Sequence, residues 1–136
     1  MRELESHGST PALEDVGRKK ILVVDDDLPL RGMLSSVLRR SGFQVYLAAD
    51  GSEAQRVLTI HRPHVILLDL MMPGINGWDF LQTLRDTGFL PQTPVIVVSA
   101  HLQRDPQLLL QMGVRAILPK PFNLDELLDL IRHVAP

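Results

Sequence analysis

The sequence predicts an α/β protein with a parallel sheet of five strands that alternate with five helices. Two observations carry this prediction. Short runs of β-branched and aliphatic residues recur along the chain, and segments with apolar residues at helical spacing separate them. Continuous apolar runs of this length are typical of strands buried on both faces of a parallel sheet. Regular alternation with helices predicts right-handed crossovers and a doubly wound sheet with helices on both faces.

The first three elements follow from local signals. Residues 21–24 are a short apolar run that ends in three aspartates, and we expect a strand there. Asp27 is expected to cap a helix, with Pro29 in its first turn, where the missing N–H costs little. This helix should end at Gly42, and residues 44–48 should form the second strand.

The remaining elements repeat the pattern, with turn formers between them. Further helices are expected at residues 52–61, 77–86, 106–112 and from Asn123 onward. Further strands are expected at 64–68, 95–98 and 115–118, and Pro73-Gly74 should form a turn. Within 106–112, one helix cannot bury Leu108, Leu109 and Leu110 together, so some of this apolar surface should be exposed.

Composition restricts the classes of function. The 136 residues suffice for one domain, with residues 1–18 as a flexible polar tail and residues 19–136 as the folded unit. A net charge of −2 gives no broad basic field for nucleic acid. The lack of cysteine excludes thiolate chemistry, and no apolar run approaches the roughly 20 residues that span a bilayer. We therefore expect a cytoplasmic protein without membrane contact.

Polar side chains follow four of the predicted strands. Asp25 and Asp26 come after the first strand, Asp69 after the third, Ser99 after the fourth and Lys120 after the fifth. In open parallel sheets, ligands bind at the carboxyl ends of the strands, near the point where the strand order reverses. These three acids, one hydroxyl and one amine should therefore meet at one edge of the sheet.

The chemistry of these groups is mutually consistent. Clustered carboxylates repel one another unless a cation neutralises them, and oxygen ligands without His or Cys favour a hard ion such as Mg²⁺. A carboxylate such as Asp69 can attack a phosphoryl group and give an aspartyl phosphate. The metal, Lys120 and the Ser99 hydroxyl would then each neutralise or bind one phosphoryl oxygen.

Four segments carry a resemblance to a known family. They are VVDDD (23–27), LLDLMMPGINGWDF (67–80), VIVVSA (95–100) and LPKPF (118–122). In this order and on these strands, they resemble the signature blocks of the receiver domains of two-component response regulators. The resemblance covers about residues 20–134. It implies a flavodoxin-like fold with strand order 2-1-3-4-5 and a Mg²⁺-dependent switch that catalyses only its own phosphorylation and dephosphorylation.

The resemblance also assigns roles at the metal and phosphate positions. Asp69 resembles the phosphoacceptor, and Asp25 and Asp26 resemble the acidic pair that holds Mg²⁺. The backbone carbonyl of Met71 resembles the main-chain metal ligand. The Met71 side chain, which we expect to pack against the sheet, and His101 occupy positions that tune the lifetime of the phosphate.

Three further positions concern switching. Ser99 resembles the switch hydroxyl, and Lys120 resembles the amine that pairs with the phosphoacceptor, typically before a cis peptide bond to Pro121. Receivers often carry an aromatic ring at the position of Ile117. The chemistry does not need this ring. Without it, a signal would have to use either the loop between the fourth strand and the helix at 106–112 or the packing of that helix, both biased by Ser99.

Partners follow from the same resemblance. The phosphodonor would be a histidine kinase or a phosphotransfer protein, and a downstream protein would bind the face formed by residues 106–118 and the last helix. The chain is expected to act by protein contacts, as a monomer or weak homodimer, either alone or as a fragment of a larger regulator. Two alternatives remain open: a phosphate-independent binding module of the same fold, and a phosphatase with an aspartate nucleophile.

Overall fold

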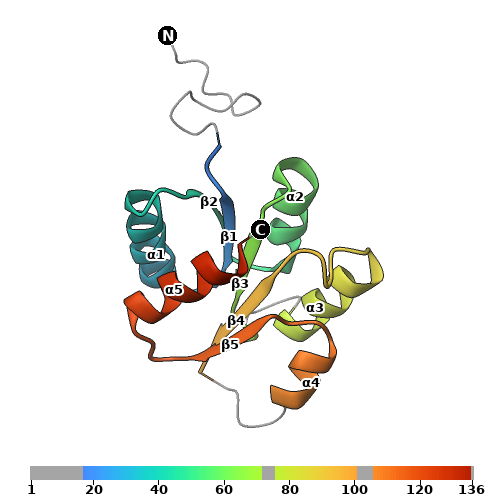
Figure 1. Ribbon diagram of the computed structural model, residues 1–136. Coiled ribbons are helices and arrows are strands. Elements are labelled where there is room, and N and C mark those ends of the chain that lie inside the picture. Colours follow the sequence, from blue (N-terminus) through green and yellow to red (C-terminus); the bar gives the residue numbers. More distant parts are fainter. Residues whose placement is uncertain (1–16, 72–75, 101–105, 136) are drawn as a thin grey trace.

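A single parallel sheet forms the centre of the protein, which we describe from a computed structural model (Figure 1). The structure describes residues 17–71, 76–100 and 106–135. Its strands are β1 (Lys20–Val24), β2 (Gln44–Ala48), β3 (Val65–Leu68), β4 (Val95–Ser99) and β5 (Ala116–Pro119). They lie in the order β2-β1-β3-β4-β5, and every pair is parallel. The predicted fold class and strand order are confirmed.

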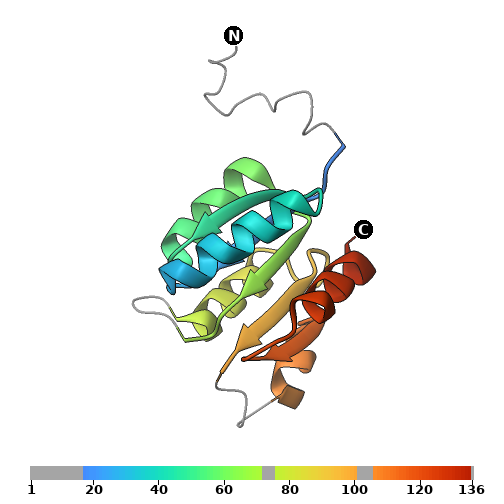
Figure 2. The same ribbon diagram turned by 90° about the vertical axis from the view of Figure 1, so that its left-hand side faces the viewer.

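The described residues also form five helices, which cover both faces of the sheet, as Figure 2 shows. They are α1 (Leu28–Arg40), α2 (Gly51–His61), α3 (Gly77–Asp86), α4 (Pro106–Gln111) and α5 (Leu124–Val134). The buried residues form two clusters, one on each face. One cluster joins the sheet to α1 and α5, and the other joins it to α2, α3 and α4.

Local signals in the sequence set the starts of four helices. Each begins after an Asp or Asn whose side-chain oxygen accepts a hydrogen bond from a backbone N–H of the first turn. This satisfies a donor that has no partner inside the helix. The capping residues are Asp27 for α1, Asp50 for α2, Asn76 for α3 and Asn123 for α5. The predicted cap at Asp27 is therefore confirmed.

Several predicted boundaries were wrong by one residue. The third strand starts at Val65 and not at His64, because the ring Nδ1 of His64, and not a backbone carbonyl, accepts from the Lys20 N–H at 2.9 Å. β4 includes Ser99, and β5 runs from Ala116 to Pro119, because Ser99 pairs with Pro119 in the register. The second helix includes Gly51, directly after its cap, and α4 ends one residue early, at Gln111.

Two segments of interest fall outside the described residues. The predicted tail over residues 1–18 lies almost wholly there, as does the predicted turn at Pro73-Gly74. On α4, Leu109 is buried while Leu108 and Leu110 are exposed, as the sequence predicted. No helix in the described ranges is long and apolar enough to cross a membrane.

Candidate functional site

Asp25 and Asp69 follow the ends of the adjacent strands β1 and β3. β2 pairs with one edge of β1 and β3 with the other, so the strand order reverses at β1, and this is the switch point of the topology. The Asp25 N–H donates to the Ala48 carbonyl (3.1 Å), and the Asp69 N–H donates to the Val24 carbonyl (2.9 Å). The backbones of both residues thus continue the hydrogen bonding of the sheet, and this fixes the positions from which their side chains extend.

Asp26 joins these two residues in a cluster of three acids. Each contributes a carboxylate oxygen, and these oxygens lie within 4.8 Å of one another. Asp25 is 4% exposed and Asp69 is 6% exposed, whereas Asp26 is exposed to solvent. The cluster therefore combines two buried carboxylates with one exposed carboxylate. The sequence predicted that these residues would meet, and the structure confirms it.

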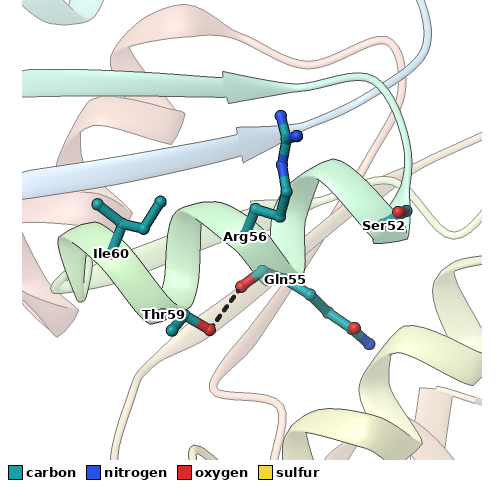
Figure 3. A pocket seen from close by; sticks show the side chains of 5 residues that line it. All are labelled: Ser52, Gln55, Arg56, Thr59 and Ile60. Atoms are coloured by element: carbon teal, nitrogen blue, oxygen red, sulfur yellow. Dashed lines mark hydrogen bonds between the residues drawn. The ribbon is translucent and has the colours of Figure 1, made fainter.

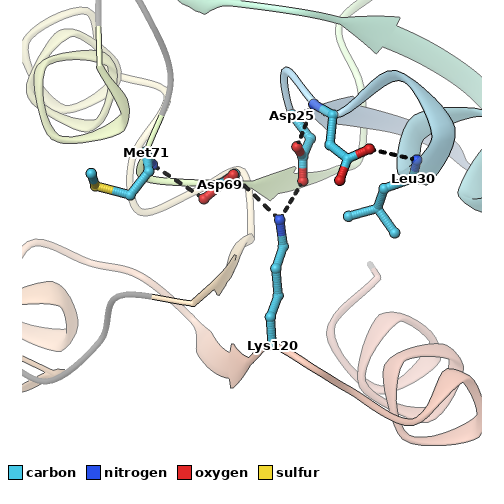
Figure 4. Close-up of polar contacts among 6 residues, drawn as sticks. Asp25, Leu30, Asp69, Met71 and Lys120 are labelled. Carbon is cyan, nitrogen blue, oxygen red and sulfur yellow. Dashed lines mark hydrogen bonds and ion pairs between the residues drawn. The ribbon is translucent and has the colours of Figure 1, made fainter.

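Lys120 supplies a positive charge to this cluster from the end of β5. Its Nζ lies 2.9 Å from Asp25 Oδ2 and 3.3 Å from Asp69 Oδ2, so one ammonium bridges the two buried carboxylates (Figure 4). The following peptide bond, Lys120–Pro121, is cis, as the family resemblance implied. The Lys120 N–H also donates to the Ser99 carbonyl at 3.1 Å, which ties the end of β5 to the end of β4.

The electrostatics of the pair are dominated by burial and proximity. Burial raises the pKa of Asp25, with a contribution from the nearby charge of Asp69, although the hydrogen bonds from Lys120 and Asp27 oppose the change. Burial alone would lower the pKa of Lys120, but the hydrogen bond and charge of Asp25, together with those of Asp69, leave it raised. Lys120 therefore stays protonated, and the fold disfavours the ionised form of Asp25.

Backbone N–H groups orient the remaining carboxylate oxygens. Met71 N–H donates to Asp69 Oδ1 (3.1 Å), and Asp27 N–H donates to Asp25 Oδ1 (2.9 Å). The Asp27 side chain instead caps α1, since its Oδ1 accepts from the Leu30 N–H at 3.1 Å. Asp27 lies outside the acid cluster, which agrees with the prediction that it is a cap and not a ligand.

The remaining predicted site residues differ in their burial and in their place in the fold. Ser99 is fully buried at the end of β4, opposite Pro119 in the register, and its carbonyl accepts from the Lys120 N–H. Ile117 lies further back on β5, half-buried against the cluster that includes α4. Met71 is 52% exposed, so the expected packing of its side chain against the sheet is wrong; the residue follows the end of β3. His101 lies outside the described residues.

An apolar groove opens beside Lys120, and the sequence did not predict it. Its volume is about 560 Å³, and one wall comes from α1 while the other comes from the segment between β5 and α5. The lining residues are Leu30, Met33, Ala100, Lys120, Pro121, Phe122 and Leu124. The groove was missed because its walls come from segments about 90 positions apart in the sequence, each with an ordinary apolar pattern.

A second hollow, of about 370 Å³, lies on the outer surface of α2. The described residues that line it all belong to this helix, namely Ser52, Gln55, Arg56, Thr59 and Ile60 (Figure 3). The Thr59 hydroxyl donates to the Gln55 carbonyl at 3.0 Å, which is an ordinary bond within a helix. The hollow includes no residue from a strand end, so the candidate site remains the edge at Asp25, Asp69 and Lys120.

A doubly wound sheet of this order, with an acid cluster and a lysine at its switch point, defines the class of CheY-like receiver domains. The chain belongs to the response regulator receiver domain family, whose pattern matches residues 21–132. This confirms the resemblance on which the sequence interpretation was based.

Individual relatives agree with this assignment. The chain is 41% identical over 120 residues to the DNA-binding response regulator MtrA of Mycolicibacterium smegmatis, a match that covers 87% of this chain and 51% of MtrA. It thus spans about half the length of the curated relatives it matches. The chemotaxis protein CheY4 of Vibrio cholerae is 31% identical in sequence, with a TM-score of 0.80, over 87% of this chain and 99% of CheY4.

A third structure is that of the response regulator TrrA of Thermotoga maritima in complex with Mg²⁺ and BeF. It is 28% identical to this chain, with a TM-score of 0.76, and the match covers 85% of this chain and 98% of TrrA. Like CheY4, TrrA is matched over almost its whole length.

Proposed function

We propose that this chain accepts a phosphoryl group on Asp69 and acts as a switch in two-component signalling. The observation that carries this proposal is the position of the Asp69 carboxylate, which is buried at the switch point, 3.3 Å from the Lys120 ammonium and beside two further acids. One Asp69 oxygen attacks the phosphorus of a phosphohistidine or an acyl phosphate. A P–O bond forms, the bond to the leaving group breaks, and an aspartyl phosphate remains.

The acid cluster fits a divalent cation. Asp25, Asp26 and Asp69 offer three carboxylate oxygens within 4.8 Å, without His or Cys, and this ligand set suits Mg²⁺. Burial already disfavours the charge on Asp25, so a cation there would relieve a real electrostatic cost. We assign the backbone carbonyl of Met71 as a fourth ligand, by its family position. When bound, Mg²⁺ would neutralise charge on the phosphoryl oxygens.

Lys120 and Ser99 complete the proposed phosphate site. The Lys120 ammonium already contacts Asp69 and would move to a phosphoryl oxygen as negative charge accumulates there. Ser99 is buried next to Lys120 at the end of β4, so its hydroxyl is in place to respond to a new anion. We assign to Met71, and to His101 outside the described residues, an influence on how long the phosphate persists.

The phosphodonor, a histidine kinase or a phosphotransfer protein, must reach the buried Asp69. We propose that it approaches over the apolar groove beside Lys120, because Leu30 and Met33 on α1 give it a contact surface next to the reacting group. A protein surface docked there would cover the acid cluster and exclude water from the transfer.

The output surface that we propose is the face of α4, β5 and α5. Leu108 and Leu110 are exposed on α4, and exposed apolar residues on one face are typical of a protein contact. Ile117 stands half-buried beneath this face where other receivers carry a ring. In the DNA-binding relatives this segment is about half of the protein, so we propose the same regulatory role for residues 19–136 here, with residues 1–18 outside the domain.

Beryllofluoride, which mimics an aspartyl phosphate, tests this proposal without a kinase. We expect ¹H–¹⁵N spectra to show a complex only when Mg²⁺ and beryllofluoride are both present, with shifts at Met71, Ser99 and Lys120. Asp69→Asn should form no complex. Asp26→Asn, at the exposed member of the cluster, should keep the fold but weaken Mg²⁺ binding by about tenfold or more. A wild-type spectrum that does not respond to Mg²⁺ and beryllofluoride would exclude the proposal.

A further inference from the structure

Gly77 stands in the first turn of α3 although its backbone conformation does not require glycine. Four described glycines, Gly17, Gly42, Gly88 and Gly113, have positive φ angles that other residues rarely adopt, and Gly77 is not among them. Glycine in a helix is normally destabilising relative to alanine. Its presence at the start of α3 therefore points to a restriction on space and not on conformation.

The restriction comes from the backbone of the phosphoacceptor segment. A Cβ atom on Gly77 would lie 2.3 Å from Leu70 Cα and 2.7 Å from the Asp69 carbonyl oxygen, distances that real Cβ atoms essentially never show. Both neighbours are main-chain atoms, so neither can rotate away as a long side chain would. The Gly77 N–H also donates to the Leu70 carbonyl at 2.9 Å. The first turn of α3 thus lies directly against the end of β3.

The same short segment holds the reacting carboxylate. Asp69 Oδ1 accepts from the Met71 N–H and Asp69 Oδ2 contacts Lys120, so the segment from Asp69 to Met71 fixes both carboxylate oxygens. Leu70 is 1% exposed, which anchors the middle of the segment in the core. A shift of this backbone away from Gly77 would therefore carry the carboxylate with it.

We propose that Gly77 is a positioning residue for Asp69. The absence of a side chain lets α3 press against Asp69 and Leu70, and this contact sets the distance from the Asp69 carboxylate to Lys120 and Asp25. The inference rests on the proposed phosphorylation of Asp69 and adds a part that lies outside the acid cluster. It also implies that the first turn of α3 senses the occupancy of the site.

Gly77→Ala tests the proposal. Relief of the contact requires the backbones to separate by about 1 Å, and a displacement of that size can slow a reaction by about 100-fold. With Mg²⁺ and acetyl phosphate, we expect the maximal rate of phosphoryl gain, measured by intact mass and corrected for the folded fraction from urea denaturation, to fall at least tenfold. Half-saturation by acetyl phosphate should change less than the maximal rate.

Gly32→Ala is the matched control. Gly32 lies within α1 with no atom near its hypothetical Cβ, so the same chemical change should leave the phosphorylation rate within twofold of wild type. A folded Gly77→Ala protein that is phosphorylated at the wild-type rate would overturn the inference. Failure of the wild-type chain to gain a phosphoryl group would instead count against the proposed function, so the two failures are distinguishable.

A measurement on the wild-type protein covers the case in which Gly77→Ala does not fold. During titration with Mg²⁺ and beryllofluoride, the amide resonance of Gly77 should shift with the same apparent affinity as that of Met71. The amide of Gly32 should not shift. If Met71 responds while Gly77 stays unchanged, α3 does not sense the site and the inference is wrong.

Discussion

Lys120 and Asp25 lie 95 residues apart in the chain and form an ion pair of 2.9 Å at the edge of the sheet. The pair spans the sheet from the end of β5 to the end of β1, and the Lys120 ammonium also reaches Asp69, at the end of β3 between them. One cation thus holds together two buried acids that would otherwise repel each other. The burial of two neighbouring acids should lower the stability of the fold, and we expect the acids to be kept for metal and phosphate binding.

Asp25→Asn should increase stability while it weakens metal binding. The fold disfavours the charge on Asp25, mainly because the side chain is buried and also because Asp69 is close. An amide of the same shape removes that charge, so the free energy of unfolding at pH 7 without Mg²⁺ should rise by about 1 kcal/mol. Urea denaturation measures this, and Mg²⁺ titration should show weaker binding than for wild type. A less stable variant would contradict the electrostatic interpretation.

Lys120→Met should have the opposite effect on stability. Removal of the ammonium leaves Asp25 and Asp69 without their shared cation, and we expect a loss of about 1–3 kcal/mol in Mg²⁺-free buffer. Mg²⁺ should restore part of this loss, because it would neutralise the same carboxylates. The control is Lys19→Met, at the amino end of the sheet, which should show no such dependence on Mg²⁺. Equal losses with and without Mg²⁺ would refute a shared electrostatic role.

Asp27→Ala separates the helix cap from the metal site. Since the Asp27 side chain caps α1 and lies outside the acid cluster, its loss should cost about 1 kcal/mol of stability, as at other N-caps. Asp50→Ala, at the equivalent cap of α2, should cost a similar amount. Mg²⁺ affinity should stay within twofold of wild type in both variants. A large loss of affinity in Asp27→Ala alone would show that Asp27 is a ligand after all.

A pH dependence should arise at the opposite edge of the sheet. Burial, with the charges of Lys19 and Lys20, lowers the pKa of His64, and its Nδ1 accepts from the Lys20 N–H at 2.9 Å, so the folded state holds this ring neutral. The unfolded chain binds a proton there at about pH 6.5, which is above the folded pKa. The contribution of the neutral His64 to the free energy of unfolding is therefore fully present above about pH 6.5 and declines as the pH falls below it.

His64→Asn tests this assignment, because an asparagine oxygen can still accept the hydrogen bond but does not titrate. Between pH 7 and pH 5.5 the loss in unfolding free energy should be smaller than for wild type, by at most about 1 kcal/mol. Burial and Lys20 also lower the pKa of His61, so some pH dependence should remain. Identical curves for the wild-type protein and His64→Asn would rule out His64 as the source.

The sequence predicted most of the fold because its signals are local. Apolar runs indicate strands buried on both faces, and Asp27, an aspartate directly before a helical apolar pattern, indicates the start of α1. The members of the site were also predictable, since parallel strands bring Asp25, Asp69 and Lys120 to one edge whatever the details of packing. The start of β3 was missed because a side chain replaces the expected backbone partner there: the His64 ring accepts from the Lys20 N–H.

The sequence could not predict how the site residues divide their tasks. Asp25 and Asp26 are adjacent acids of the same type, yet only Asp25 is buried and paired with Lys120. That difference depends on the direction of each side chain at the end of β1. The close contact of Gly77 with Leu70 was equally hidden, because it depends on how near α3 approaches the sheet.

The most direct test of the central claim is the intact mass of the chain after incubation with Mg²⁺ and acetyl phosphate. Our account predicts that the wild-type chain gains one phosphoryl group, that chelation of Mg²⁺ prevents the gain, and that Asp69→Asn gains none. This variant keeps an oxygen to accept from the Met71 N–H, so its fold should persist. Phosphorylation of Asp69→Asn to the wild-type extent would contradict the account, because the acceptor would then lie elsewhere.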